Sequence, residues 1–199
     1  MGNKEVQEMM LLMASQIQSI ANRISDEDVH CFLNEVTCAK RIYAMGAGRS
    51  GLVAKGFAMR LMHLGFTSFV VGETITPALQ REDLVVIFSG SGETKTIADL
   101  AETAKTIGAR VCLITFSPNS RIGRIADCVV TISSQREETR DPSAEFEVRQ
   151  MMGEHKSFAP LGTLFETAAM VFADAAISAL MDIRACRIED LKGRHANIE

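Results

Sequence analysis

Between Arg41 and Ile132 the chain alternates short, continuous apolar runs with stretches typical of helices, and this alternation restricts the possible folds more than any other feature. A strand with one solvent-exposed face alternates apolar and polar residues, whereas continuous apolar strands are typical of a sheet that helices cover on both faces. The sequence therefore predicts an α/β fold with a doubly wound, five-stranded parallel sheet. The expected strands are 42–45, 68–71, 84–88, 111–116 and 128–132.

Helices are expected between these strands at 50–64, 94–107 and, in a shorter form, 120–126. Residues 4–38 predict two more helices, and Ser25 with Asp28 resembles a capping box at the start of the second, which runs to about Ala39. Apolar residues of the first helix recur at spacings of three and four, which predicts one apolar face for the core or for a subunit contact. They are Val6, Met9, Met10, Met13, Ile17, Ile20 and Ile24.

The C-terminal helix, which Pro160 is expected to open, is apolar nearly all round from Leu161 to Met181. Its only charged residues are Glu166 and Asp174, so we expect the helix to be buried against the sheet or a partner subunit.

The length of 199 residues, with 47% hydrophobic and 23% charged residues, predicts a single globular domain. Within it we expect N-terminal helices at 1–39, an αβ core at 40–133, an exposed charged loop at 134–157, and the C-terminal helix and tail at 158–199.

Composition also excludes several function classes. A net charge of −4 gives no attraction to nucleic acid or anionic lipid. No apolar stretch is expected to reach the ~20 residues that span a bilayer, and the N-terminus lacks the regions of a signal peptide, so we expect a cytoplasmic protein. The five cysteines form no CxxC pair and the four histidines are scattered, so neither a structural disulfide nor a metal site is predicted.

The predicted strand 84–88 is followed by the loop Ser-Gly-Ser-Gly-Glu-Thr (89–94), which leads directly into a helix. Gly90 and Gly92 allow backbone N–H groups to approach a ligand, and the helix N-terminus adds its positive dipole end. Ser89, Ser91 and Thr94 add hydroxyl donors. The loop therefore predicts an anion site, with a phosphate monoester as the expected ligand.

A second glycine loop, Gly-Ala-Gly-Arg-Ser-Gly (46–51), follows the first predicted strand and has two interpretations. As a dinucleotide loop it requires an acidic residue about 20 positions later, where Glu73 stands in a sequence that resembles a turn. Alternatively, Arg49 and Ser50 join the 89–94 loop around one phosphorylated substrate. Two serine-bearing loops at adjacent strand ends favour the second interpretation. Neither loop is a Walker A loop, so nucleotide hydrolysis is not expected.

Three further ionisable groups are candidates for chemistry. Glu166 lies in an apolar helix, where a carboxylate is costly unless it is paired or protonated, so it is either paired with an arginine at a subunit interface or a general base. The phosphate loops favour the base. His63 lies at the end of an amphipathic helix. The alternative to a catalytic role is a partly buried, helix-terminal histidine without a function. His195, in the polar tail, becomes a candidate only if the tail covers a neighbour's pocket.

Six segments, in this order, resemble the 6-phospho-3-hexuloisomerases, a family of the sugar isomerase (SIS) domain superfamily, and the resemblance extends from about Ile42 to the C-terminus. The segments are residues 46–51, Met-Arg-Leu-Met-His-Leu-Gly (59–65), Val-Gly-Glu-Thr-Ile-Thr-Pro (71–77), residues 89–94, Pro-Leu-Gly-Thr-Leu-Phe-Glu (160–166) and Arg-His-Ala-Asn-Ile-Glu (194–199). The departure from the family is the loop at 134–157, which is longer and more charged than expected.

The resemblance implies a SIS-type three-layer sandwich and a homotetramer with active sites near subunit interfaces, without a metal or organic cofactor. The implied reaction interconverts D-arabino-3-hexulose 6-phosphate and D-fructose 6-phosphate, after the aldol addition of formaldehyde to ribulose 5-phosphate or in the reverse direction.

The resemblance also implies roles for the candidate residues, with a cis-enediolate as intermediate. Glu166 would move a proton between C2 and C3. Arg49, His63 or His195 would polarise the carbonyl, and His195 could open the sugar ring from an adjacent subunit. The substrate-binding set would be Arg49, Ser50, Ser89, Gly90, Ser91, Gly92, Glu93 and Thr94.

Two alternatives stay open. One is another SIS phosphosugar isomerase, acting on arabinose 5-phosphate or a heptose phosphate. The other is a non-catalytic phosphosugar-binding protein, such as a transcription regulator, although the first forty residues show no helix-turn-helix signature.

Overall fold

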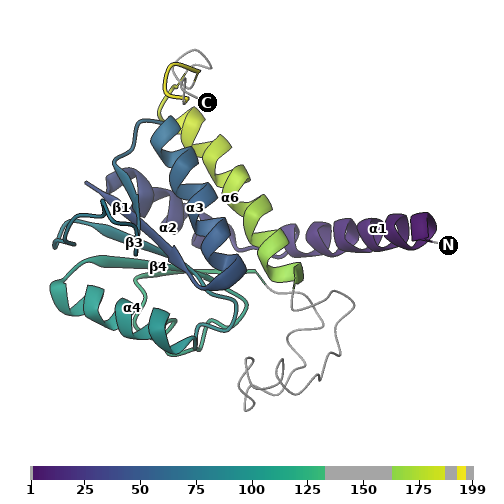
Figure 1. Cartoon of the computed structure of the whole chain (residues 1–199), viewed down its shortest axis with the longest axis horizontal. Helices are drawn as coiled ribbons and strands as arrows, with labels where there is room; N and C mark the ends of the chain where they lie inside the picture. The colour runs from purple at the N-terminus through teal and green to yellow at the C-terminus, as the bar shows by residue number, and fades with distance from the viewer. Residues whose placement is uncertain (1, 133–162, 187–191, 196–199) are drawn as a thin grey trace.

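The computed structural model describes residues 2–132, 163–186 and 192–195, and it contains a five-stranded, fully parallel sheet with the strand order β2-β1-β3-β4-β5 (Figure 1). The expected loop at 134–157 and the helix start at Pro160 lie outside the described residues. The strands are β1 (Ile42–Gly46), β2 (Ser68–Val70), β3 (Leu84–Phe88), β4 (Arg110–Thr115) and β5 (Cys128–Thr131). Each agrees with a predicted strand to within one residue at either end, and the predicted α/β fold is confirmed.

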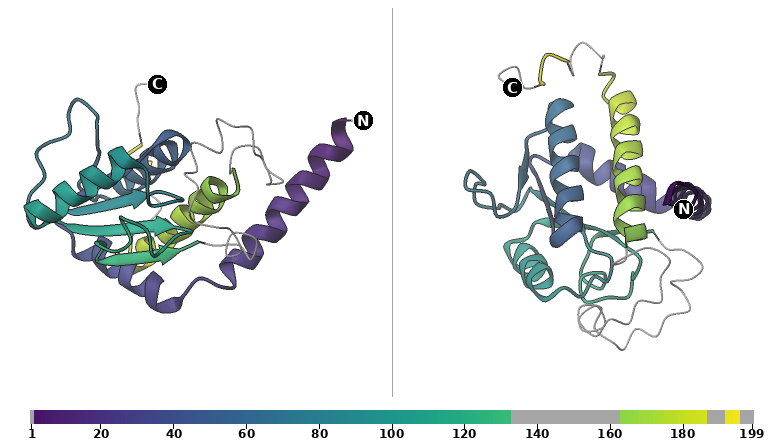
Figure 2. Two further views of the ribbon diagram at one scale, coloured as in Figure 1. Left: turned by 90° about the horizontal axis from the view of Figure 1, so that it is seen from below. Right: turned by 45° about the vertical axis from the view of Figure 1, so that its right-hand side comes forward.

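The sheet is the middle of three layers. On one face, Ala44 of β1 and Val86 of β3 belong to an apolar cluster with α3 (Gly48–His63), α6 (Thr163–Ile183) and α2 (Asp26–Cys38). On the other face, Met45 and Ile87 pack with α4 (Lys95–Ile107). Successive residues of each strand thus enter opposite clusters, which is why the central positions of these strands are apolar in continuous runs. Figures 1 and 2 show α4 on one side of the sheet and α3 with α6 on the other.

The predicted short helix at 120–126 is wrong, because the structure has turns there. The amides of Arg121 and Ile122 donate to Glu93 Oε1 and to the Gly92 carbonyl, respectively. This segment therefore serves as a support for the 89–94 loop.

The first helix, α1 (Gly2–Ala21), extends away from the rest of the chain (Figures 1 and 2). Only the C-terminal part of its apolar face packs on the core, through Ile17 and Ile20. Val6, Met10 and Leu11 in its N-terminal half are 57%, 66% and 71% exposed. The following α2 begins as predicted.

Residues Leu164–Ile183 of α6 are long and apolar enough to cross a membrane by length and composition, so the prediction that no stretch of that size exists is wrong. The helix nevertheless packs as a core helix: Phe165, Ala169 and Leu180 are at most 4% exposed, and α6 lies against α3. Its opposite face, with Met170 and Val171, is partly exposed in the single chain. The expected burial of the C-terminal helix is confirmed for the inward face.

Candidate active site

Apart from the two histidines, the candidate residues gather at the carboxyl edge of the sheet, between β1 and β3. The chain leaves β1 toward β2 on one side, and β3 leads to β4 and β5 on the other, so this is the point where the strand order reverses. In open parallel sheets such a point leaves a crevice for ligands. Gly46 pairs with Phe88 in the β1–β3 register, so the loops 46–51 and 89–94 start side by side.

Close backbone contacts shape the 46–51 loop. A Cβ on Gly46 would lie 2.8 Å from the Phe88 carbonyl oxygen and from the Ser50 carbonyl, and a Cβ on Gly51 would lie 2.8 Å from the Gly46 oxygen. Only glycine fits at these two positions. The result places Ser50, 9% exposed, in the first turn of α3 beside β3, with Arg49 exposed next to it.

The 89–94 loop is held by its own serines. Ser89 is 4% exposed, and its Oγ accepts the Gly92 N–H at 3.2 Å, while Ser91 Oγ accepts the Glu93 N–H at 3.2 Å. Both hydroxyls keep a proton to donate to a ligand. Gly92 has a φ of +64° and no space for a side chain beside Ser120, so it requires glycine. Thr94 is the N-cap of α4, whose N-terminus therefore faces the loop.

Glu166 reaches the same edge from the first turn of α6. Its neighbour Phe165 packs edge-on against Phe116, with ring centroids 5.8 Å apart, and both rings lie against Gly90. The Glu166 side chain is 16% exposed, and its Oε2 lies 3.9 Å from Nε of Arg49. The arginine pairing considered for Glu166 is therefore present within one chain, directly beside the 46–51 loop.

The two histidines are brought together, but away from this edge. The rings of His63 and His195 stack with centroids 4.0 Å apart, and Nη1 of Arg194 donates to the His63 carbonyl oxygen at 3.0 Å. His63 ends α3, thirteen residues after Ser50, or about 20 Å along the helix. Within one chain, the histidine pair and the 46–51 and 89–94 loops lie at opposite ends of α3.

His63 is 4% exposed, and its Nδ1 has no hydrogen-bond partner among the described residues. Burial lowers the pKa of His63, and the charges of His195 and Arg60 lower it further. This imidazole is consequently biased toward its neutral form.

Glu93 differs from the other members of the predicted binding set. Its Oε1 accepts the Arg121 N–H at 2.7 Å, so the carboxylate is engaged with the segment after β4. Sequence reasoning missed the residues on that side, Thr115, Ser120 and Arg121. Nothing in their local sequence distinguishes them, because their contacts depend on β4 lying next to β3.

The described residues contain no group of three or more His, Cys, Asp or Glu side chains placed to hold a metal ion. Cys112 and Cys128 are buried in strands as expected, and burial raises the pKa of the nearby Cys31 thiol to about 12. The thiol of Cys31 is therefore protonated, and the buried Cys112 and Cys128 act as small apolar groups.

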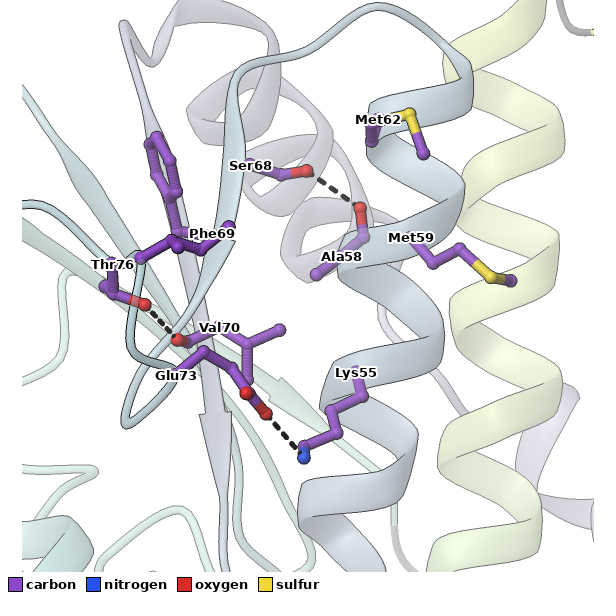
Figure 3. A pocket seen from close by; sticks show the side chains of 10 residues that line it. Lys55, Ala58, Met59, Met62, Ser68, Phe69, Val70, Glu73 and Thr76 are labelled. Carbon is purple, nitrogen blue, oxygen red and sulfur yellow. Dashed lines mark hydrogen bonds and ion pairs between the residues drawn. The ribbon is translucent and has the colours of Figure 1, made fainter. Parts of the chain in front are cut away.

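A hollow of about 270 Å³ lies beside α3 at the β2 edge of the sheet (Figure 3). It is lined by Met59, Met62 and Phe69, among others, and one wall carries an ion pair of 2.6 Å between Lys55 Nζ and Glu73 Oε1. Glu73 stands in a turn, as expected. None of the candidate catalytic or substrate-binding residues lines this hollow.

Comparison with known proteins gives a consistent result. Residues 35–152 match the SIS domain family. The chain is 38% identical to the 3-hexulose-6-phosphate isomerase of Bacillus subtilis, over 93% of this chain and 94% of that protein. It is 37% identical to the 3-hexulose-6-phosphate isomerase of Mycobacterium gastri, over 94% of this chain and 88% of that protein.

Among solved structures, a protein of Methanococcus jannaschii superimposes with a TM-score of 0.80 and 28% identity, over 96% of this chain and 99% of that one. Its crystal structure has been used to infer the function of a 3-hexulose-6-phosphate isomerase.

Proposed function

The chain belongs to the SIS domain family and is an isomerase of phosphorylated sugars, and we propose that it interconverts D-arabino-3-hexulose 6-phosphate and D-fructose 6-phosphate. The observation that carries this proposal is the meeting of two hydroxyl-bearing glycine loops and one carboxylate at the β1–β3 edge. The names of its full-length relatives support the choice of substrate. In the cell, this reaction would follow the fixation of formaldehyde on ribulose 5-phosphate.

The phosphate end of the substrate is assigned to the 89–94 loop. The hydroxyls of Ser50, Ser89, Ser91 and Thr94 would donate to its oxygens, together with backbone N–H groups around Gly90 and Gly92. The N-terminus of α4 adds a favourable field for a dianion. Binding energy from this remote group would hold the carbonyl end in place for proton transfer.

The carbonyl end is assigned to Glu166 and Arg49. Moving the carbonyl from C3 to C2 removes the C2 proton and returns a proton to C3 through a cis-enediolate. One carboxylate beside both carbons serves both transfers, and Glu166 is the group we assign. Arg49, 3.9 Å away, places a positive charge where the enediolate oxygens develop.

His63 and His195 are assigned to the same reaction through a neighbouring copy. Because the pair lies about 20 Å along α3 from Ser50, it would reach an active site only across a subunit interface. The proposed assembly is a homo-oligomer, with a tetramer as the expected form, in which this end of α3 faces the carboxyl edge of another copy.

The proposal is tested by incubating the protein with fructose 6-phosphate in deuterated water. We expect 3-hexulose 6-phosphate to form with deuterium at C2, and the recovered fructose 6-phosphate to carry deuterium at C3. Both follow from an enediolate that exchanges its proton through one base.

The other outcomes of this experiment identify the alternatives. Deuterium at C1 of fructose 6-phosphate, without 3-hexulose formation, would indicate a different phosphosugar isomerase. Binding without exchange at any carbon would indicate a phosphosugar sensor. Either result would overturn the proposed reaction.

A further inference from the structure

Residues at the end of β4 and directly after it form hydrogen bonds to the backbone of the 89–94 loop. The Gly90 carbonyl oxygen accepts from Thr115 Oγ1 at 2.7 Å and from the Phe116 N–H at 3.2 Å. The Gly92 carbonyl oxygen accepts the Ile122 N–H at 3.2 Å. Two of the loop's carbonyl groups are thus directed toward the β4 side.

The Thr115 hydroxyl is buried and fully engaged. The residue is 0% exposed, and its Oγ1 accepts the Ser117 N–H at 3.0 Å while donating to Gly90. A buried hydroxyl is costly unless it is bonded, and valine has nearly the same shape without that cost. The position therefore uses the hydroxyl to orient the neighbouring backbone.

This orientation affects the ligand side of the loop. In a trans peptide the C=O and the following N–H point in opposite directions. When Thr115 and Phe116 hold the Gly90 carbonyl toward β4, the Ser91 N–H points to the other side, and no partner for it is found among the described residues. The Ser91 amide is thereby presented as a donor at the position assigned to the phosphate.

Glu93 forms a second contact between the 89–94 loop and the segment after β4. Its carboxylate accepts the Arg121 N–H at 2.7 Å, and the Arg121 guanidinium is held in turn by Asp99 and Glu102 of α4, each at 2.7 Å. The loop, the segment after β4 and the first turns of α4 are therefore linked through one arginine.

We propose that Thr115 and Glu93 are positioning residues, which set the shape of the 89–94 loop and thereby its affinity for phosphate without touching the substrate. This inference rests on the proposed function, and it assigns Glu93 a different role from the direct binding expected from the sequence.

The first test compares Thr115→Val, Thr115→Ser and the control Ser68→Ala, which removes a hydroxyl bond to a backbone carbonyl (2.8 Å) elsewhere. The measured quantities are KM and kcat for fructose 6-phosphate, the inhibition constant of inorganic phosphate, and Tm. Thr115→Val should raise KM and the phosphate inhibition constant about tenfold and change kcat less than about twofold, as expected for one misdirected donor. Thr115→Ser should restore both constants, and Ser68→Ala should change neither. An unchanged KM in Thr115→Val would overturn the proposal for Thr115.

The second test uses the exposed position Glu93, where folding is not at risk. Glu93→Gln keeps an oxygen that can accept the Arg121 N–H, so it should bind phosphate almost as wild type does, whereas Glu93→Ala should weaken phosphate binding about tenfold. If the charge of Glu93 contacts the substrate, Glu93→Gln will change KM as much as Glu93→Ala. That result would overturn a positioning role.

Hydrogen exchange separates this inference from the proposed function. If the wild-type protein neither binds nor converts the sugar phosphate, the proposed function fails. Whether or not the proposed function holds, Thr115→Val should speed amide exchange at Phe116 and Ser117 in the absence of ligand, because both amides belong to the network around Gly90. Unchanged exchange at both amides would reject the inference.

Discussion

At the scale of single residues, the chemistry depends on how one carboxylate is surrounded. Glu166 is 16% exposed and has the Arg49 guanidinium 3.9 Å away, and its helix turn packs on Gly90 through Phe165. It lies in the same chain as the 46–51 and 89–94 loops and at the same edge of the sheet. In the proposed mechanism, a base in this position acts on the carbonyl end while the 89–94 loop holds the phosphate.

Glu166→Gln should lower kcat by ~100-fold or more, the scale of losing a general base, and leave the KM for fructose 6-phosphate within a few fold. Glutamine keeps the size of the side chain but cannot accept a proton at neutral pH. Steady-state kinetics with fructose 6-phosphate give both constants. Near-normal turnover would remove Glu166 from the role of base.

The matched contrast is the double variant Ser89→Ala, Ser91→Ala. It removes two donors from the phosphate end only, so KM should rise at least ~10-fold while kcat falls much less. Opposite kinetic effects in the two variants would distinguish binding from proton transfer.

At the scale of elements, α3 carries functional groups at both ends. Its N-terminal turn holds Arg49 and Ser50 at the carboxyl edge of the sheet, and its C-terminal residue, His63, stacks on His195 at the opposite end. Arg194 fixes the tail there by donating to the His63 carbonyl. In the proposed assembly, one end of α3 therefore belongs to the phosphate site of its own copy. The other end carries the histidine pair that would reach the active site of another copy.

Acid should destabilise this end of α3. The pKa of His63 is lowered, first by burial and then by His195 and Arg60, and Arg194 adds a further positive charge beside the His63 carbonyl. Below about pH 6.5 the unfolded chain binds a proton that the folded chain resists, so the free energy of unfolding falls as the pH falls. His63→Gln should reduce this dependence.

The measurement is Tm between pH 8 and pH 5 for the wild type, for His63→Gln and for the control His30→Gln at an exposed site on α2. The control should follow the wild-type curve. Equal slopes for His63→Gln and the wild type below about pH 6.5 would contradict the assignment of the acid sensitivity to His63.

At the scale of the whole molecule, the single chain leaves apolar surface uncovered. Val6, Met10 and Leu11 are exposed on the projecting α1, and Leu52 and Met59 of α3 are 64% and 50% exposed. Extended apolar faces of this kind are typical of subunit interfaces. They support the proposed homo-oligomer, in which α1 would pack against another copy.

Leu11→Glu tests this part of the proposal. Leu11 is 71% exposed in the single chain, so the substitution should not unfold a monomer, but it would bury a charge in an interface and weaken assembly. Light scattering should report a smaller mass than for the wild type. Leu100→Glu, at another partly exposed leucine on α4, serves as the control for a general effect of added charge.

Local sequence patterns determined much of the fold of this protein and most parts of its candidate site. Continuous apolar runs predicted all five strands, because a buried parallel strand needs apolar residues on both faces. Glycines and hydroxyl residues at the ends of two of these strands predicted the loops at 46–51 and 89–94, because a close backbone approach requires glycine. The isolated carboxylate of Glu166 in an apolar helix predicted this residue as a member of the same site.

Only the tertiary structure decided which of these parts meet. It placed Arg49 beside Glu166, brought His195 against His63, and replaced the predicted helix at 120–126 with turns that hold the 89–94 loop. The physical reason is that such contacts depend on strand order and on donors satisfied by distant segments. Periodicity along the chain reports which face of an element is buried, but it carries no information about which loops become neighbours in space.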